Sequence, residues 1–169
     1  MGLEFFNTQT GGGEDLTAIG NLAGTAEYQA RFEGLSNTEV INSIYLSLFG
    51  RPAEGDGADF WAGELEAGRV TINDIAIAIL DGAQNDDLVI VQNKLVASDL
   101  FTTRLDLPAE VDDYVGSFAA EVGRDFLDGI TTDASTIPNA EVTDLQIAFL
   151  DRDASEVMVV GSTSDADMF

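Results

Sequence analysis

The sequence predicts a mainly α-helical protein, a compact helical domain of about six to seven helices with a short terminal β element. Apolar residues recur three and four positions apart over most of the chain. Helix-capping residues, such as Ser36, and glycines at helix ends, such as Gly50, separate these stretches. Only residues 3–6 and 156–161 read as strands. We expect three regions: a flexible arm at 1–15, a helical domain at 16–150 and an acidic tail with a short strand at 151–169.

The first elements are an arm and a capped helix. The apolar residues 3–6 are followed by a polar stretch that ends in three glycines, 11–13, which is typical of a flexible arm. Thr25 can cap a following helix that carries Tyr28 and Phe32 on one face.

Ser36 and Glu39 form a capping-box pattern, which predicts the start of a strong helix. Gly50 can end this helix in the left-handed conformation. The loop 51–57 follows. The apolar face of the helix consists of Val40, Ile41, Ile44, Tyr45, Leu48 and Phe49.

The middle of the chain contains two further helices, one of them ambiguous. The first should carry Phe60, Trp61 and Leu65 inward and end at Gly68. Residues 71–82 alternate like a strand but also follow helical spacing, and the Thr71-x-x-Asp74 cap and Gly82 favour the helix.

Three helices complete the predicted domain. The longest runs over 85–104. Pro108 suits the first position of the next, and Pro138-Asn139 introduces the last, through Leu145 and Phe149. The inward residues of the first are Leu88, Val91 and Leu95, and those of the second are Val111, Val115, Phe118 and Val122.

Charge and composition exclude several classes of function. The 169 residues carry 31 Asp and Glu against 7 Lys and Arg, a net charge of −24, so phosphate backbones and anionic lipids are repelled. The chain has no Cys and no His, which excludes thiolate nucleophiles, disulfides, Cys/His zinc sites and a His general base. We expect no enzymatic activity and no nucleic-acid partner.

Neither a membrane span nor an N-terminal signal peptide is recognisable. No run approaches the roughly 18 apolar residues of a spanning helix, and the first ten residues lack a basic region before a long apolar stretch. We therefore expect no membrane insertion, and either a cytoplasmic protein or one exported without an N-terminal signal peptide.

Residues 40–54, with Gly57, Phe60-Trp61 and Gly68, resemble a bacterial helical domain-of-unknown-function family numbered 4214. The run 81–88 and the lead-in 26–36 look like the same family, so the resemblance covers about residues 24–150. The core 45–51 is more weakly similar to phycobilisome linker domains. The resemblance implies an extracellular or cell-surface location, in S-layer-like and secreted proteins often exported by type I secretion.

Calcium is the ligand that the composition suggests, because hard cations take carboxylate oxygens. Solvated charges without a metal are the alternative for every candidate. The candidates lie in three stretches: Glu54, Asp56 and Asp59; Asp86 and Asp87; Asp151 and Asp153.

Two further features allow a functional and a structural interpretation. Arg51 could bind an anionic ligand, but capping of the preceding helix or an ion pair with Glu54 or Asp59 is favoured. The pair Phe60-Trp61 could stack on a sugar, but its helical spacing with Leu65 favours a place in the core.

The sequence thus favours an extracellular structural protein that self-assembles into a surface layer or filament, with calcium bridging acidic subunits. An arm or strand would leave its own subunit and add to the next. The alternatives are a monomeric cell-surface anchoring or glycan-binding module of adhesin type, whose partner is a surface polysaccharide, and a cytoplasmic linker-like scaffold. The assembly candidates are Leu3, Phe5, Phe6, Val157, Val159 and Val160.

Overall fold

The computed structural model describes residues 24–150, which are mainly helical. Eight α-helices and one 3-10 helix lie within these residues, and no strand occurs among them. The mainly α fold class is confirmed, although six to seven helices was too low a number. Both predicted strands, the arm and the tail lie outside the described residues. The α-helices are α3 (Ala26–Phe32), α4 (Asn37–Phe49), α5 (Gly55–Glu66), α6 (Ile75–Asp81), α7 (Asn85–Arg104), α8 (Pro108–Asp113), α9 (Gly116–Leu127) and α10 (Ala140–Ile147).

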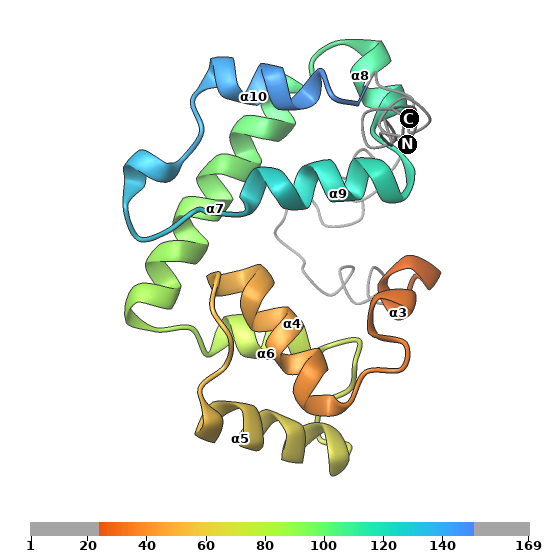
Figure 1. The fold of residues 1–169 in the computed structure, drawn as a ribbon, viewed down its shortest axis with the longest axis vertical. Helices are drawn as coiled ribbons and strands as arrows, with labels where there is room; N and C mark the ends of the chain where they lie inside the picture. The colour runs from red at the N-terminus through yellow and green to blue at the C-terminus, as the bar shows by residue number, and fades with distance from the viewer. Residues whose placement is uncertain (1–23, 151–169) are drawn as a thin grey trace, which may run out of the picture. The chain divides into compact units, whose positions relative to one another are not determined.

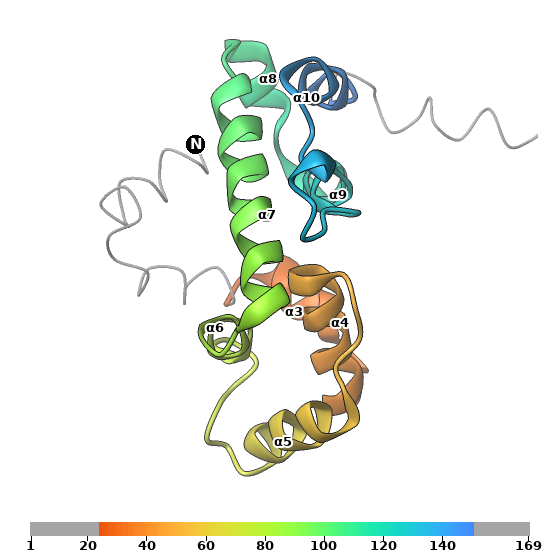
Figure 2. The same cartoon turned by 90° about the vertical axis from the view of Figure 1, so that its left-hand side faces the viewer.

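The chain divides into two compact units, Met1–Val89 and Ile90–Phe169. The division falls inside the expected domain 16–150 and within α7. The described part of the first unit contains α3 to α6 and the first residues of α7, and that of the second unit continues through α10 (Figures 1 and 2).

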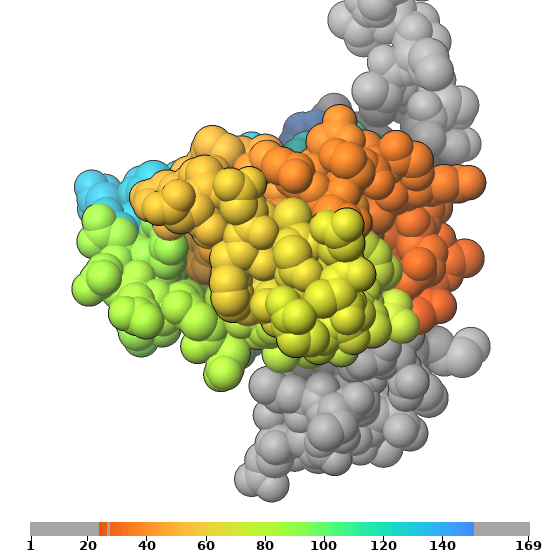
Figure 3. Space-filling view, turned by 90° about the horizontal axis from the view of Figure 1, so that it is seen from below, coloured from red at the N-terminus to blue at the C-terminus, as the bar shows by residue number. Residues whose placement is uncertain are grey.

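In the first unit, the predicted capping signals form as expected. The Ser36 hydroxyl accepts a hydrogen bond from the Glu39 amide, and the Glu39 carboxylate accepts one from the Ser36 amide. Gly50 ends α4 in the left-handed conformation, with φ 68°. α4 packs along α5, and Figure 3 shows the face of the molecule on which these two helices lie. The predicted inward face of α4 is confirmed by the burial of Val40, Ile41, Ile44 and Phe49.

The ambiguous stretch 71–82 is helical from Ile75 to Asp81, as the capping signals favoured. Ile75 and Ile79, four positions apart, are buried. In α5, by contrast, only Ala58 is buried, and the prediction of an inward Phe60 is wrong because this ring is 57% exposed. α5 therefore packs on α4 largely through small and partly buried side chains.

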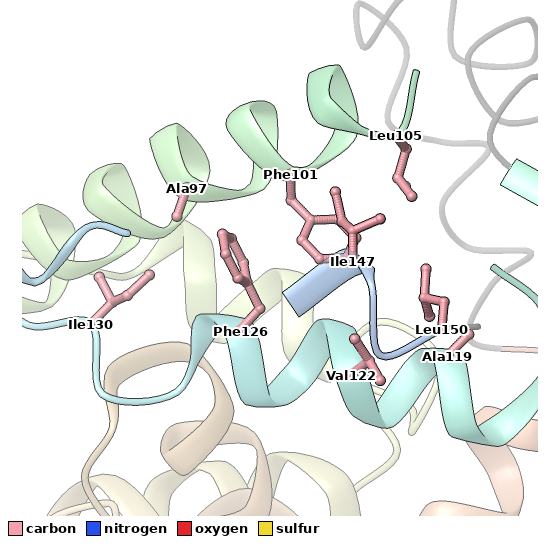
Figure 4. Packing of buried hydrophobic residues seen from close by; sticks show 9 residues of the cluster. All are labelled: Ala97, Phe101, Leu105, Ala119, Val122, Phe126, Ile130, Ile147 and Leu150. Carbon is pink, nitrogen blue, oxygen red and sulfur yellow. The ribbon is translucent and has the colours of Figure 1, made fainter. Parts of the chain in front are cut away.

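The second unit has one contiguous hydrophobic core. Figure 4 shows Ala97, Phe101 and Leu105 of the α7 side facing Ala119, Val122 and Phe126 of α9. Phe101 and Phe126 have ring centroids 4.9 Å apart. Ile147 of α10 closes the cluster, together with Ile130 and Leu150.

The inward face expected for α7 is wrong. Leu88 and Leu95 are exposed, whereas the stripe Lys94, Ala97 and Phe101 is buried. A lysine can belong to such a stripe because its aliphatic stem can be buried while its ammonium group reaches outward. Burial lowers the pKa of Lys94, and the nearby Asp128 carboxylate opposes this shift.

The segment predicted to run as one helix from Pro108 past Val122 is two helices. Pro108 begins α8 as expected, but the chain breaks after Asp113, and α9 begins at Gly116, whose φ is 78°. Val115 lies in this break with extended backbone and is exposed, which contradicts its predicted inward place.

Candidate functional site

The loop that joins α4 to α5 is held by hydrogen bonds of Ala53 and Arg51 within the first unit. Gly50 ends α4, and the Oδ1 atom of Asn42 accepts a hydrogen bond of 3.0 Å from the Ala53 amide. The Arg51 guanidinium donates two hydrogen bonds to the Asp87 carboxylate, at 3.0 Å from Nε and 2.7 Å from Nη2. This fork ties the loop to the first turn of α7.

The environment of Arg51 agrees with a structural role. The hydrogen bonds to Asp87 raise the pKa of Arg51, whose guanidinium also lies 5.7 Å from the centre of the Tyr45 ring. Glu54 is a more distant partner at 3.9 Å. The sequence correctly suggested Glu54, but it missed Asp87, which is 36 residues away along the chain and carries no local signal of the pairing.

The calcium candidates of the first unit lie at the starts of two helices. Glu54 precedes α5 and Asp56 belongs to its first turn, while Asp86 and Asp87 belong to the first turn of α7. Negative charge is stabilised at these positions by the helix dipole. Asp87 is already committed to Arg51, and the side chains of Glu54, Asp56, Asp59 and Asp86 are exposed.

No group of three or more acidic side chains suited to a metal ion occurs in residues 24–150. The carboxylates of the α5 start are thus presented separately to solvent. Asp151 and Asp153 lie outside the described residues, as do the assembly candidates Leu3, Phe5, Phe6, Val157, Val159 and Val160.

An aromatic pair is accessible on α5. The rings of Phe60 and Trp61 meet edge to face, with centroids 5.0 Å apart. Phe60 is exposed, so the core place expected for the pair is wrong for this ring, and Trp61 is only half-buried. Two other aromatic rings that could stack on a sugar, those of Tyr28 and Tyr114, are both half-buried.

Helix α6 presents apolar side chains on two sides. Its sequence from Ile75 to Leu80 contains only Ile, Ala and Leu. Ile75 and Ile79 face the interior of the first unit, whereas Ile77 and Leu80 are 37% and 36% exposed. A helix that is hydrophobic all round is usually buried on all sides. We call the exposed pair Ile77 and Leu80 the α6 outer face.

The sequence comparisons identify one family. Residues 20–89 match the family described as a domain of unknown function, DUF4214, and this match ends where the first compact unit ends. The resemblance expected for residues 90–150 is not covered by the match and stays a prediction. No curated protein and no solved structure matches the chain. Among the helices described here, none has the length and apolar character needed to cross a membrane.

Proposed function

Because residues 20–89 belong to the DUF4214 family, we propose that they form the contact-making part of a structural, non-enzymatic protein that assembles with copies of itself outside the cell. The observation that carries this proposal is the α6 outer face. Ile77 and Leu80 extend a helix that already buries Ile75 and Ile79, so a second layer of protein would complete its burial.

Charge determines the conditions under which such contacts form. Copies that each carry −24 repel one another unless cations screen or bridge them. Three of the seven basic side chains offer little free positive charge to offset this repulsion, because Arg51, Arg69 and Arg104 each pair with a carboxylate. Calcium ions placed between the separate carboxylates of two copies would reduce the repulsion. Asp56 and Asp59 are exposed and could bind such ions.

The experiment is sedimentation velocity and negative-stain microscopy of the purified chain in calcium, in EDTA and in sodium chloride. We expect large assemblies in calcium and their loss in EDTA. The double substitution Ile77→Ser/Leu80→Ser should abolish assembly, whereas Leu95→Ser, at an exposed leucine of the second unit, should not.

The possible outcomes separate the parts of the proposal. A monomer in every condition overturns assembly. Assemblies that survive both EDTA and the α6 substitutions contradict the calcium link and the α6 contact. Deletion of residues 1–13 tests the arm with Leu3, Phe5 and Phe6, and unchanged assembly after this deletion would exclude the arm as the joint.

The second candidate function is glycan binding, and the exposed ring of Phe60 beside Trp61 favours it. A neutral sugar could stack on the Phe60 face, since aromatic rings bind the apolar faces of sugars, while the acidic surface disfavours anionic polysaccharides. Titration with neutral oligosaccharides should change the Trp61 fluorescence of the wild type and not that of Phe60→Ala. Absence of any change in the wild type excludes this candidate.

A further inference from the structure

Helix α10 in the second unit is apolar on two sides. Thr143 and Ile147 are fully buried, and Leu150 just beyond the helix is buried with Ile147 in the core. Val142, Leu145 and Phe149 are exposed, and their spacing of three and four residues places them along one other side of the helix. We call these three residues the α10 outer face. Leu145, at its centre, is 62% exposed.

One carboxylate beside this face, that of Asp144, is paired with an arginine. The Arg104 guanidinium forks onto the Asp144 carboxylate, with 2.6 Å between Nε and Oδ1, and this pairing raises the pKa of Arg104. Asp144 immediately precedes Leu145. An apolar segment can therefore cover Leu145 without burying an unpaired carboxylate at the preceding position.

The chain itself supplies a matching segment directly after α10. Beyond Leu150, the sequence contains one run of four apolar residues, Val157-Met158-Val159-Val160, and a shorter apolar pair, Met168-Phe169, in a stretch that is mostly polar and acidic. Six residues, 151–156, separate this run from Leu150. Six extended residues span about 20 Å, whereas the eight residues of α10 span about 12 Å. The linker is thus long enough to return the run to any part of the outer face.

We propose that residues Val157–Val160 dock on the α10 outer face of the same chain. In an extended segment, Val157 and Val159 project to one side and can pack on Val142 and Leu145. The short linker gives the run an effective concentration near the millimolar range at this face, above that of a neighbouring copy at micromolar protein. This inference does not depend on the proposed assembly, and it places the run within its own chain rather than exchanged between copies.

A disulfide experiment tests the contact directly, because the natural chain has no cysteine. The double variant Leu145→Cys/Val159→Cys is oxidised mildly at low protein concentration. We expect an intramolecular disulfide that forms at least about tenfold faster than in the matched control Leu95→Cys/Val159→Cys. Leu95 is also an exposed leucine of the second unit, at 63%, but lies on α7. Equal rates in the two variants, or a disulfide only between two chains, would overturn the proposal.

Methionine NMR provides a second readout without cysteines. The chain has three methionines, Met1, Met158 and Met168, so methyl-labelled methionine gives few signals. The Met158 methyl signal should move to its unfolded position in Leu145→Asp and keep its wild-type position in Leu95→Asp. Circular dichroism checks that both variants fold. A Met158 signal at the unfolded position already in the wild type contradicts docking.

Discussion

Both units hold their helices with an ion pair between an arginine and an aspartate, but the two pairs differ in their exposure to solvent. Each has an Arg–Asp fork: Arg51–Asp87 in the first unit and Arg104–Asp144 in the second. The Asp87 side chain is only 18% exposed, whereas that of Asp144 is 46% exposed. An ion pair is screened less where solvent is excluded, so the first fork should contribute more to stability than the second.

The hydrophobic cores rank the two units the other way round, because apolar packing contributes more in the second unit. The first unit buries mainly β-branched residues, such as Ile41 and Ile75, and its buried phenylalanines contact half-buried tyrosines. In the second unit two buried rings, Phe101 and Phe126, contact each other. The second core is also continuous from α7 through α9 to α10. The first unit therefore depends more on polar contacts of its loops, and the second more on apolar packing.

The largest expected effect comes from the cores. Phe126→Ala should lower the free energy of unfolding of the second unit by about 3–5 kcal/mol, because it leaves a cavity beside Phe101. Ile41→Ala should lower that of the first unit by about 2–5 kcal/mol. Denaturant unfolding is followed by circular dichroism for the whole chain and by the fluorescence of Trp61, the single tryptophan, for the first unit.

We expect Phe126→Ala to shift the Trp61 transition less than the circular dichroism transition, since Trp61 belongs to the other unit. Ile41→Ala should shift the Trp61 transition directly. If both variants shift both signals equally, the chain unfolds as one cooperative body and the comparison of two units fails.

The two forks provide the next test. Asp87→Asn should lower the free energy of unfolding by about 1–2 kcal/mol, a value reduced for the partial exposure of Arg51. Asp144→Asn should have a smaller effect. Both variants remove one negative charge, so their comparison cancels the general relief of repulsion. Thermal unfolding in low and high salt measures the effects, and an Asp144→Asn loss as large as that of Asp87→Asn would contradict the ranking.

The sequence predicted well those features that depend on neighbours along the chain. The capping box at Ser36, the left-handed Gly50 and the first-turn Pro108 were correct, because each acts within four residues. The choice of helix over strand in 71–82 was correct, although the helix covers only Ile75–Asp81 and begins four residues after Thr71.

The features that depend on distant residues were not predictable. Asp87 pairs with Arg51 across 36 residues, and no sequence pattern near either residue predicts this pairing. The buried stripe of α7 includes Lys94. Contacts of α7 with α9 and with the loop that follows α9 decide which side of α7 faces inward. Hydrophobicity alone assigned Leu95 to that side, although it is exposed.

A glycine comparison should give a smaller effect than the forks. A Cβ atom at Gly123 would lie 2.6 Å from the Tyr114 Oη atom, whereas one at Gly57 would lie 3.6 Å from the Tyr45 Oη atom. Gly123→Ala must displace the Tyr114 ring, and the cost exceeds the gain in helix propensity, for a net loss of about 1 kcal/mol.

Gly57→Ala meets only an ordinary contact and should be neutral or stabilising by up to about 1 kcal/mol. Thermal unfolding of the two variants measures the difference. A stabilised Gly123→Ala would show that Tyr114 moves freely, and Gly123→Ala/Tyr114→Phe should recover the loss, because it removes the hydroxyl that clashes.

The smallest expected effect concerns Lys94 and appears only as a dependence on pH. Burial lowers its pKa in the fold below the ordinary value of 10.5, so the unfolded chain binds more protons between these two values. In that window the contribution of Lys94 to stability rises with pH, and below it the contribution is constant. The melting temperature of the wild type minus that of Lys94→Met should therefore increase from pH 7.5 towards pH 10. Taking this difference cancels the groups common to both proteins, including Tyr28, whose pKa burial raises. A difference that falls with pH would mean that the charged lysine is favoured by the fold, through Asp128, and that the second unit also depends on a polar contact at its centre.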